Sequence, residues 1–356
     1  MKVGIIGLPQ TGKNTLFQVL TSIERKEHTT PSKAIQGIAE ILDARFDILV
    51  DTYVPKKTVR AKVDLVLLPK MEQEAIARGD IFRDFADMDA ICHIVRAFED
   101  EAVYHVDGSV NPMRDIDMVN SELILHDLLF IEKRIERIEN TLKKIKDEVQ
   151  QKELILLIKM KEHLEGEKPL RLMAFSEDEE AFIKSYPFIT KKQMVLVLNI
   201  AEDKIQNNKL MQDLKERCDL DLMKVMQISA QVESEIVMLD TDEEKEEFLS
   251  ELGIKEPALS TLARLCLEAL GLVSFFTVGT DEVRQWLVKT GSSAPEAAGV
   301  IHSDLQRGFI RAEVMKYDEL MEHGNEAELK KAGKIYLHGK DYIVDDGDIL
   351  NIRFKV

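Results

Sequence analysis

The sequence predicts an α/β protein: a mainly parallel sheet with a phosphate loop, a helical coiled-coil insertion in that domain, and a C-terminal α+β module. Three observations indicate this fold class. Residues 1–7 form a short apolar run that opens directly into a glycine-rich turn. Leucine, isoleucine and valine recur at heptad spacing across residues 128–149, and short runs of strand-forming residues stand on both sides of that stretch.

The turn after the first strand reads Gly7-Leu-Pro-Gln-Thr-Gly-Lys-Asn-Thr15 and fits the pattern G-x-x-x-x-G-K. Gly7 and Gly12 can take backbone angles that a β-carbon forbids, so successive N–H groups can turn inward and bind phosphate oxygens. Lys13 then reaches the outer phosphates. The pattern also occurs by chance, but the strand before it and the apolar helix stripe after it favour a phosphate site.

Two features on the metal side depart from this pattern. Position 14 is Asn instead of Ser or Thr, and an amide oxygen could coordinate magnesium with a different reach. The strand-like run 59–68 contains Asp64, the acid expected beside magnesium, but Leu67 occupies the place of the glycine that follows it. A side chain there would obstruct the approach of the backbone to the γ-phosphate. Phosphate binding is therefore expected, whereas metal-assisted hydrolysis stays open.

Composition limits the protein class. The 356 residues include 48 basic and 65 acidic ones, which give a formal net charge of −17. This balance argues against broad electrostatic binding to nucleic acid, so an RNA contact would need a local basic face. Three widely spaced cysteines in apolar surroundings indicate buried free thiols. No signal peptide or membrane-length apolar stretch is visible, so we expect a cytoplasmic protein without membrane contact.

Residues 115–165 form the predicted arm. We expect a first helix with one apolar seam, a turn or skipped step at Gln150-Gln151, and a second helix that folds back in a monomer. The alternative is a coiled coil that joins two chains. The seam residues are Leu128, Ile131, Ile135, Ile138, Leu142, Ile145 and Val149, followed in the second helix by Leu154, Leu157, Met160 and Leu164.

Two later strand-like runs end in polar residues. Asn199 ends the run 193–199 and Glu202 follows it, and Ser229 and Ala230 stand at the end of the run that begins at Val225. Because parallel strands end at the same edge of a sheet, these residues are expected at the ligand edge. Asn199 can recognise a purine and tie the base loop to the phosphate loop, or it can simply end a strand as a turn residue.

From about residue 274 the chain reads as strand, strand, helix, strand and closing strands, which is typical of a compact α+β module. The predicted domains are a P-loop nucleotide-binding domain in two parts, 1–118 and 191–273, the coiled-coil insertion 119–190, and the C-terminal module 274–356.

Over nearly its whole length the chain resembles the YchF, or Obg-like ATPase, family of the TRAFAC P-loop GTPase superfamily. The resemblance implies a GTPase-like domain and a C-terminal TGS domain of the β-grasp kind. It also implies ATP binding with weaker GTP binding, magnesium as an optional cofactor, and association with the ribosome or ribosomal RNA in translation or stress control. The stretches that carry it are 111–117, 120–123, 199–203, 294–302 and 308–317.

Carried over by position, the resemblance assigns a role to individual residues. Lys13 takes a catalytic position, and Leu68 stands where ordinary GTPases have the glutamine that orients water. Asn14 and Asp64 take the metal positions. The nucleotide-binding positions are Gln10, Thr11, Gly12, Lys13, Asn14, Thr15, Asn199, Glu202, Ser229 and Ala230.

Departures from the family pattern cluster on the γ-phosphate side. Besides the changes at positions 14 and 67, Pro31 stands where the family has its switch Thr, and residues 70–77 lack the glycines of its switch segment. Thr29 or Thr30 could take over the switch contact. Two functions stay open: an ATPase with weak hydrolysis, or a non-hydrolysing nucleotide-binding adaptor for the ribosome or RNA.

An RNA contact would fall to the arm together with the TGS domain. The arm carries a basic stripe, although the glutamates between its members are equally typical of a solvated helix face. The basic residues are Lys133, Arg134, Arg137, Lys143, Lys144 and Lys146.

Overall fold

The computed structural model describes residues 1–23, 33–69, 84–101, 103, 105, 108–254 and 256–355. The expectations for Thr29, Thr30, Pro31 and the switch segment 70–77 lie outside these residues. The chain divides into two compact units, Met1–Ile38 with Asp64–Leu259 and Ala39–Val63 with Ser260–Val356.

The first unit is built on a six-stranded sheet in the order β2-β4-β1-β5-β6-β7. The neighbours from β4 through β7 pair in parallel, which confirms the predicted mainly parallel sheet. Their carboxyl ends therefore share one edge, where the loops that follow β1, β5, β6 and β7 meet. The strands are β1 (Lys2–Ile6), β2 (Ile35–Glu40), β4 (Lys62–Leu67), β5 (Ala90–Ala97), β6 (Gln193–Ile200) and β7 (Lys224–Ile228).

Helices cover this sheet because its central strands are apolar on both faces. β5 and β6 are almost continuously buried, as expected of central parallel strands. Leu196 and Leu198 share a core with Ile116 at the start of α5 and with Leu214 of α8. The helices of this unit outside the arm are α1 (Lys13–Thr21), α8 (Lys209–Leu220), α9 (Ala230–Val237), α10 (Asp242–Glu251) and α11 (Ala258–Ala269), which continues into the second unit.

The strand expected over residues 59–68 is wrong in one respect, because the chain there forms two strands in different sheets. β3 (Lys57–Val59) pairs with β9 of the second sheet, and β4 pairs with β1 of the first. Arg60 lies between them, in an ion pair with Asp47 and with its guanidinium 4.8 Å from the centroid of the Phe46 ring. Alternating apolar residues continue through the break, so the pattern could not show a change of partner.

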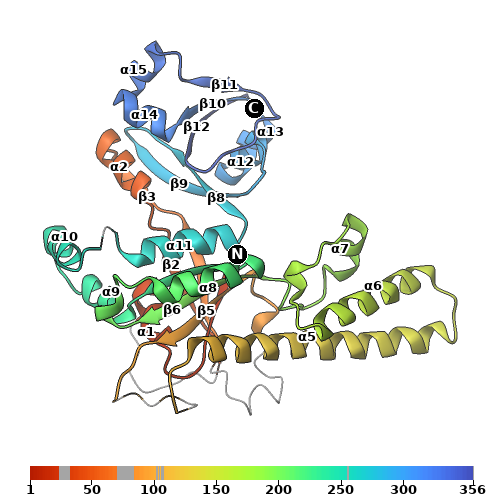
Figure 1. Ribbon diagram of the computed structural model, residues 1–356. Helices are drawn as coiled ribbons and strands as arrows, with labels where there is room; N and C mark the ends of the chain where they lie inside the picture. Colours follow the sequence, from red (N-terminus) through yellow and green to blue (C-terminus); the bar gives the residue numbers. More distant parts are fainter. Residues whose placement is uncertain are drawn as a thin grey trace. The chain divides into compact units, whose positions relative to one another are not determined.

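The arm is a hairpin of α5 (Pro112–Leu142) and α6 (Glu148–Glu165), as Figure 1 shows. Ile131 and Ile138 of α5 share a core with Leu157 and Met160 of α6, so the two seams bury each other within one chain. Among the described residues, no helix is both long enough and apolar enough to cross a membrane.

The predicted break at Gln150-Gln151 is wrong, because the turn comes earlier, at residues 143–147. Asp147 caps α6 by accepting hydrogen bonds from the backbone nitrogens of Val149 and Gln150, at 3.0 and 3.1 Å. Ile145 and Val149 therefore leave the seam, and they are 63% and 61% exposed. After the arm, η1 (Leu170–Leu172) and α7 (Glu177–Ile183) lead into β6.

The second unit is an α+β module, as predicted, on a sheet of order β11-β10-β12-β8-β9-β3. Alanines of α12 pack on one face with Phe275, and Phe46 of α2 packs on the other face with Phe276. The prediction assigned residues 39–63, which hold α2 and β3, to the nucleotide-binding domain; the structure packs them with the C-terminal sheet. The elements are α2 (Ala44–Tyr53), β8 (Leu272–Thr277), β9 (Glu282–Lys289), α12 (Ala294–Ile301), α13 (Ser303–Arg307), β10 (Phe309–Lys316), α14 (Tyr317–His323), α15 (Glu326–Lys331), β11 (Tyr336–His338) and β12 (Asp348–Phe354).

A buried carboxyl group joins α9 to the start of α11. Glu233 is 2% exposed, and its Oε1 accepts a hydrogen bond of 2.7 Å from the Ala258 backbone nitrogen. Its Oε2 has no hydrogen-bond partner within the described residues. Burial raises the pKa of Glu233 to about 7, against the lowering effect of the backbone donors at Ala258 and Leu259.

This carboxyl makes stability depend on pH. Because its pKa in the folded protein lies above the unfolded value, the folded state holds an extra proton at intermediate pH, and this contribution to stability is lost as pH rises through about 7. Glu233→Gln should match the parent protein near pH 4 and exceed its unfolding free energy at pH 8 by about 3 kcal/mol. Urea unfolding at both pH values measures this, with exposed Glu246→Gln as the control. A difference between parent and Glu233→Gln that is independent of pH would contradict it.

Candidate functional site

The phosphate loop links β1 to α1 at the carboxyl edge of the first sheet. Gly12, the residue before α1, has φ 86°, and Gln10 also lies in the left-handed region at φ 59°. A Cβ on Gly7 would collide with the Ile94 carbonyl oxygen of β5, and a Cβ on Gly12 would collide with the amide nitrogen of Asn199. Both glycines are thus required by the neighbours of the loop as well as by its backbone angles.

Lys13 is the first residue of α1 and is 5% exposed. Its Nζ donates a hydrogen bond of 2.8 Å to the carbonyl oxygen of Leu8, and the Thr11 hydroxyl donates to the same oxygen at 3.1 Å. The Lys13 ammonium also adds to the effect of burial, which lowers the pKa of His93 on β5 to about 3, so His93 is neutral.

Asn199, the seventh residue of β6, connects two loops at this edge. Its Nδ2 donates to the Thr11 carbonyl oxygen at 2.9 Å, and its Oδ1 accepts from the Ala230 backbone nitrogen at 3.0 Å. The side chain is almost fully buried. These bonds supply the tie between the phosphate loop and the β7–α9 loop that the sequence suggested. The contact of Asn199 with a purine stays a prediction.

Ser229 and Glu202 lie beside the site in different roles. The Ser229 hydroxyl accepts from the Val232 backbone nitrogen at 3.4 Å and so caps α9. Glu202 is exposed on the short turn η2 (Glu202–Lys204) after β6.

A cavity of about 400 Å³ opens next to the phosphate loop. Pockets for drug-sized ligands fall within roughly 300–1,000 Å³, so the volume suits a nucleoside. Four of the predicted binding residues line it, while Gln10, Thr11, Lys13, Asn14, Glu202 and Ser229 do not. The lining residues are Gly12, Thr15, Phe98, Glu99, Asp100, Asn199, Ile200, Ala201, Ala230, Gln231, Ser234 and Glu235.

The loop after β5 forms a wall that sequence reasoning missed. Arg96 is 1% exposed and donates to the backbone oxygens of Phe98 and Val103, at 3.1 and 2.9 Å. Its guanidinium also lies 4.6 Å from the centroid of the Phe98 ring. An arginine near the end of an otherwise apolar strand was the available signal, because such a residue needs buried partners.

β4 does not bring Asp64 to the phosphate loop. The register pairs Asp64 with Lys2 and Leu67 with Ile5, so Asp64 stands beside the amino end of β1. Four residues of strand, about 13 Å, separate that level from Ile6. Leu67 and Leu68 occupy the carboxyl end of β4 and are fully buried. The magnesium role predicted for Asp64 therefore has no support from its position, and Leu68 brings no polar group to the site.

The residues present fit phosphate better than they fit a metal ion. The glycine cradle and Lys13 match an anion, and the exposed Asn14 and the half-buried Thr15 on α1 could offer oxygens to magnesium. Across the described ranges, no group of three or more His, Cys, Asp or Glu side chains is arranged to hold a metal ion.

Comparison with known proteins gives the same picture over the full length. Residues 272–355 match the family model YchF-GTPase_C, described as a protein of unknown function (DUF933). The chain is 40% identical to the Ribosome-binding ATPase YchF of Bacillus subtilis, with all of both chains covered. It is 39% identical to the protein of that name from Pasteurella multocida, covering 100% of this chain and 99% of the relative.

A solved structure extends the likeness to three dimensions. The YchF GTPase of Schizosaccharomyces pombe superposes with a TM-score of 0.81 at 28% identity, covering 99% of this chain and 97% of the other. Since both sequence relatives align from end to end and the fold is shared, this chain belongs to the YchF family.

Proposed function

We propose that this protein binds adenine nucleotides at the phosphate loop and acts on the ribosome with little or no hydrolysis. The single observation that carries the nucleotide site is the pair of Asn199 hydrogen bonds, which holds the phosphate loop and the β7–α9 loop on one cavity wall. Phosphate groups would lie on the loop N–H groups and Lys13, and the base would lie in the cavity between Phe98 and α9.

A preference for ATP over GTP follows from the residue expected to contact the base. Guanine is normally read by an aspartate that accepts two hydrogen bonds from its edge. The residue at that position is Glu202, which is exposed and is not part of the cavity lining. GTP would therefore lose the contact that distinguishes it.

The first prediction concerns nucleotide binding. ATP should bind in the micromolar range and GTP more weakly, and Lys13→Ala should weaken ATP about a hundredfold because it removes a charge-assisted contact to phosphate. Calorimetric titration of both nucleotides measures this, with Lys215→Ala on α8 as the matched control. Equal affinities for ATP and GTP would refute the base preference, and unchanged binding by Lys13→Ala would refute the site.

The expectation of weak hydrolysis follows from the γ-phosphate side of the phosphate loop. A preorganised donor lost from a transition state typically costs about two to three orders of magnitude in rate. Here the carboxyl end of β4 presents Leu67 and Leu68, whereas the cradle and Lys13, which bind the ground state, are intact. Binding without efficient turnover is the outcome, and it favours the adaptor over the ATPase.

The second prediction tests this with Asn14→Ser, which restores the usual hydroxyl at an exposed position. The parent should hydrolyse ATP near background, with little change in affinity between magnesium and EDTA, and the variant should gain a several-fold magnesium dependence. Single-turnover hydrolysis and titration measure both. Leu67→Gly is a poor test, because emptying a fully buried leucine site costs about 2–5 kcal/mol. Brisk magnesium-dependent hydrolysis by the parent would overturn the adaptor function.

The relatives are named ribosome-binding ATPases, which is why we propose the ribosome as the partner of this chain. The arm offers a surface that could contact it. Arg134 is unavailable, because its Nε and Nη2 donate to the Glu153 carboxylate at 2.8 and 2.9 Å. The turn at the tip is different: three lysines and one isoleucine are exposed there within four residues. These residues, Lys143, Lys144, Ile145 and Lys146, make up the arm tip.

The third prediction concerns the arm tip. Replacing its three lysines by glutamate should weaken ribosome association. It should also make the fall of log affinity with log salt less steep, by about two in slope, because each phosphate contact releases counterions. Co-sedimentation with ribosomes across a salt series measures this. Lys209 and Lys215 on α8, changed together to glutamate, are the control. A salt-independent association, or a slope that the tip variant leaves unchanged, would exclude this mode.

A further inference from the structure

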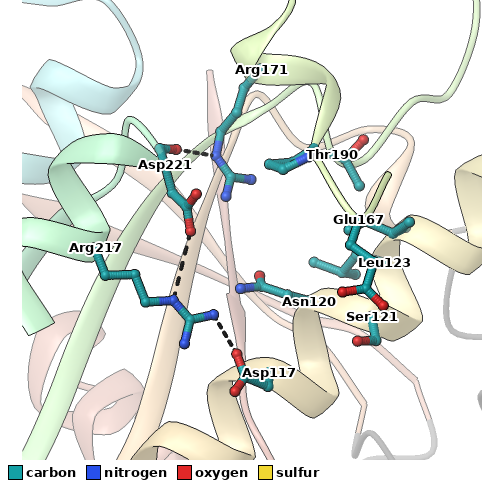
Figure 2. A pocket seen from close by; sticks show the side chains of 11 residues that line it. Asp117, Asn120, Ser121, Leu123, Glu167, Arg171, Thr190, Arg217 and Asp221 are labelled. Carbon is teal, nitrogen blue, oxygen red and sulfur yellow. Dashed lines mark hydrogen bonds and ion pairs between the residues drawn. The ribbon is translucent and has the colours of Figure 1, made fainter. Parts of the chain in front are cut away.

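A second, smaller cavity lies in the first unit, where the arm begins. Its volume is about 140 Å³, enough for one small molecule and too small for a nucleotide. Figure 2 shows it between the first turns of α5, the chain after α6, Thr190, and the end of α8. Part of its wall comes from 111–117 and 120–123, stretches that the nucleotide site does not use. The lining residues are Asp117, Asn120, Ser121, Leu123, Ile124, Glu167, Pro169, Arg171, Thr190, Arg217 and Asp221.

Arg171 is the central cation of this wall. It is 8% exposed, and its Nε donates to the Asp221 backbone oxygen at 2.8 Å. Within the described residues its two terminal nitrogens have no hydrogen-bond partner, and Figure 2 shows them directed into the cavity. Burial lowers the pKa of Arg171 to about 10, so the guanidinium remains charged at neutral pH. A buried cation with two free donors requires an anion or water.

Asn120 adds a second donor. Its half-buried side chain faces the same cavity, and in the described part of the chain no residue hydrogen-bonds its amide group. The neighbouring Thr190 is already satisfied, because its hydroxyl donates to Asp127 at 2.7 Å and accepts from the Leu170 nitrogen at 3.2 Å. Arg171 and Asn120 therefore both present donors to this cavity.

The charges of the lining indicate which anion fits. Arg217 is matched by Asp117 in a close ion pair and by Asp221 at 3.9 Å. Glu167 has no ion-pair partner among the described residues, and in Figure 2 it lies beside Ser121, across the cavity from Arg217. Two arginines and three acids line the cavity, so the wall is slightly acidic. This disfavours a phosphate dianion and favours a single carboxylate accompanied by a positive group.

We propose that this cavity binds a small zwitterion of the α-amino acid class, with its carboxylate on Arg171 and Asn120 and its ammonium group toward Glu167. The carboxylate would accept the two parallel N–H donors of the guanidinium, the strongest geometry for this pair. Only a small side chain fits beside these groups, because the volume is limited.

Calorimetric titration of the full chain with glycine, L-alanine, L-serine, acetate and inorganic phosphate tests the proposal. An amino acid should bind with saturation, and Arg171→Gln should weaken it about tenfold or more. Glu167→Gln should weaken the amino acid about two- to fivefold and leave acetate unchanged or tighter, because acetate has no ammonium group. Arg137→Gln, an exposed arginine of α5, is the matched control.

Two further measurements keep the test decisive. Lys13→Ala removes the phosphate-loop contact, and amino acid binding should persist in it, which separates this site from the nucleotide site. If Arg171→Gln does not fold by circular dichroism, Asn120→Ala, which removes no hydrogen bond of the described protein, should still reduce affinity. No saturable binding, binding insensitive to these variants, or a preference for phosphate in the Lys13→Ala protein would each overturn the proposal.

Discussion

The geometry of the phosphate loop depends on one buried amide. Asn199 uses its nitrogen on the phosphate loop and its oxygen on the loop before α9, so two segments 219 residues apart, Thr11 and Ala230, are fixed to one strand end. Loss of either bond would leave a buried polar group unpaired, which costs about 1–3 kcal/mol. Gly12 belongs to the same constraint, because no side chain fits between it and the amide. The phosphate cradle is thus positioned by tertiary structure and not by the loop alone.

Much of the fold was predictable because its signals are local. The phosphate loop, the buried strands β5 and β6, and the two helices of the arm each follow from residues next to one another in sequence. Pairing of distant elements was not predictable in this way. The turn of the arm was misplaced because heptad spacing continues to Val149, although Asp147 carries the helix-capping signal.

The site was predictable in part for the same reason. Gly12, Thr15, Asn199 and Ala230 line the cavity. They could be predicted because they belong to the loop pattern or stand at the ends of strands. Motif spacing predicted that Asp64 lies beside the phosphate loop. Its position along β1 is set by the strand register, which only the fold determines. Phe98 is oriented by Arg96, and nothing in the spacing of these residues shows that they form a wall of the cavity.

The division of the strand at Arg60 has a consequence for synthesis. β3 pairs with β9 between Lys57 and Glu282, which are 225 residues apart. At roughly 5–20 residues per second, ribosomal synthesis takes about 10–45 s to supply that partner. Until then Phe46 and Leu49 of α2, both buried in the finished sheet core, have nothing from the C-terminal sheet to cover them. The nascent chain must therefore carry this apolar segment until the C-terminal sheet has been synthesised, and during that interval chaperones can act on it.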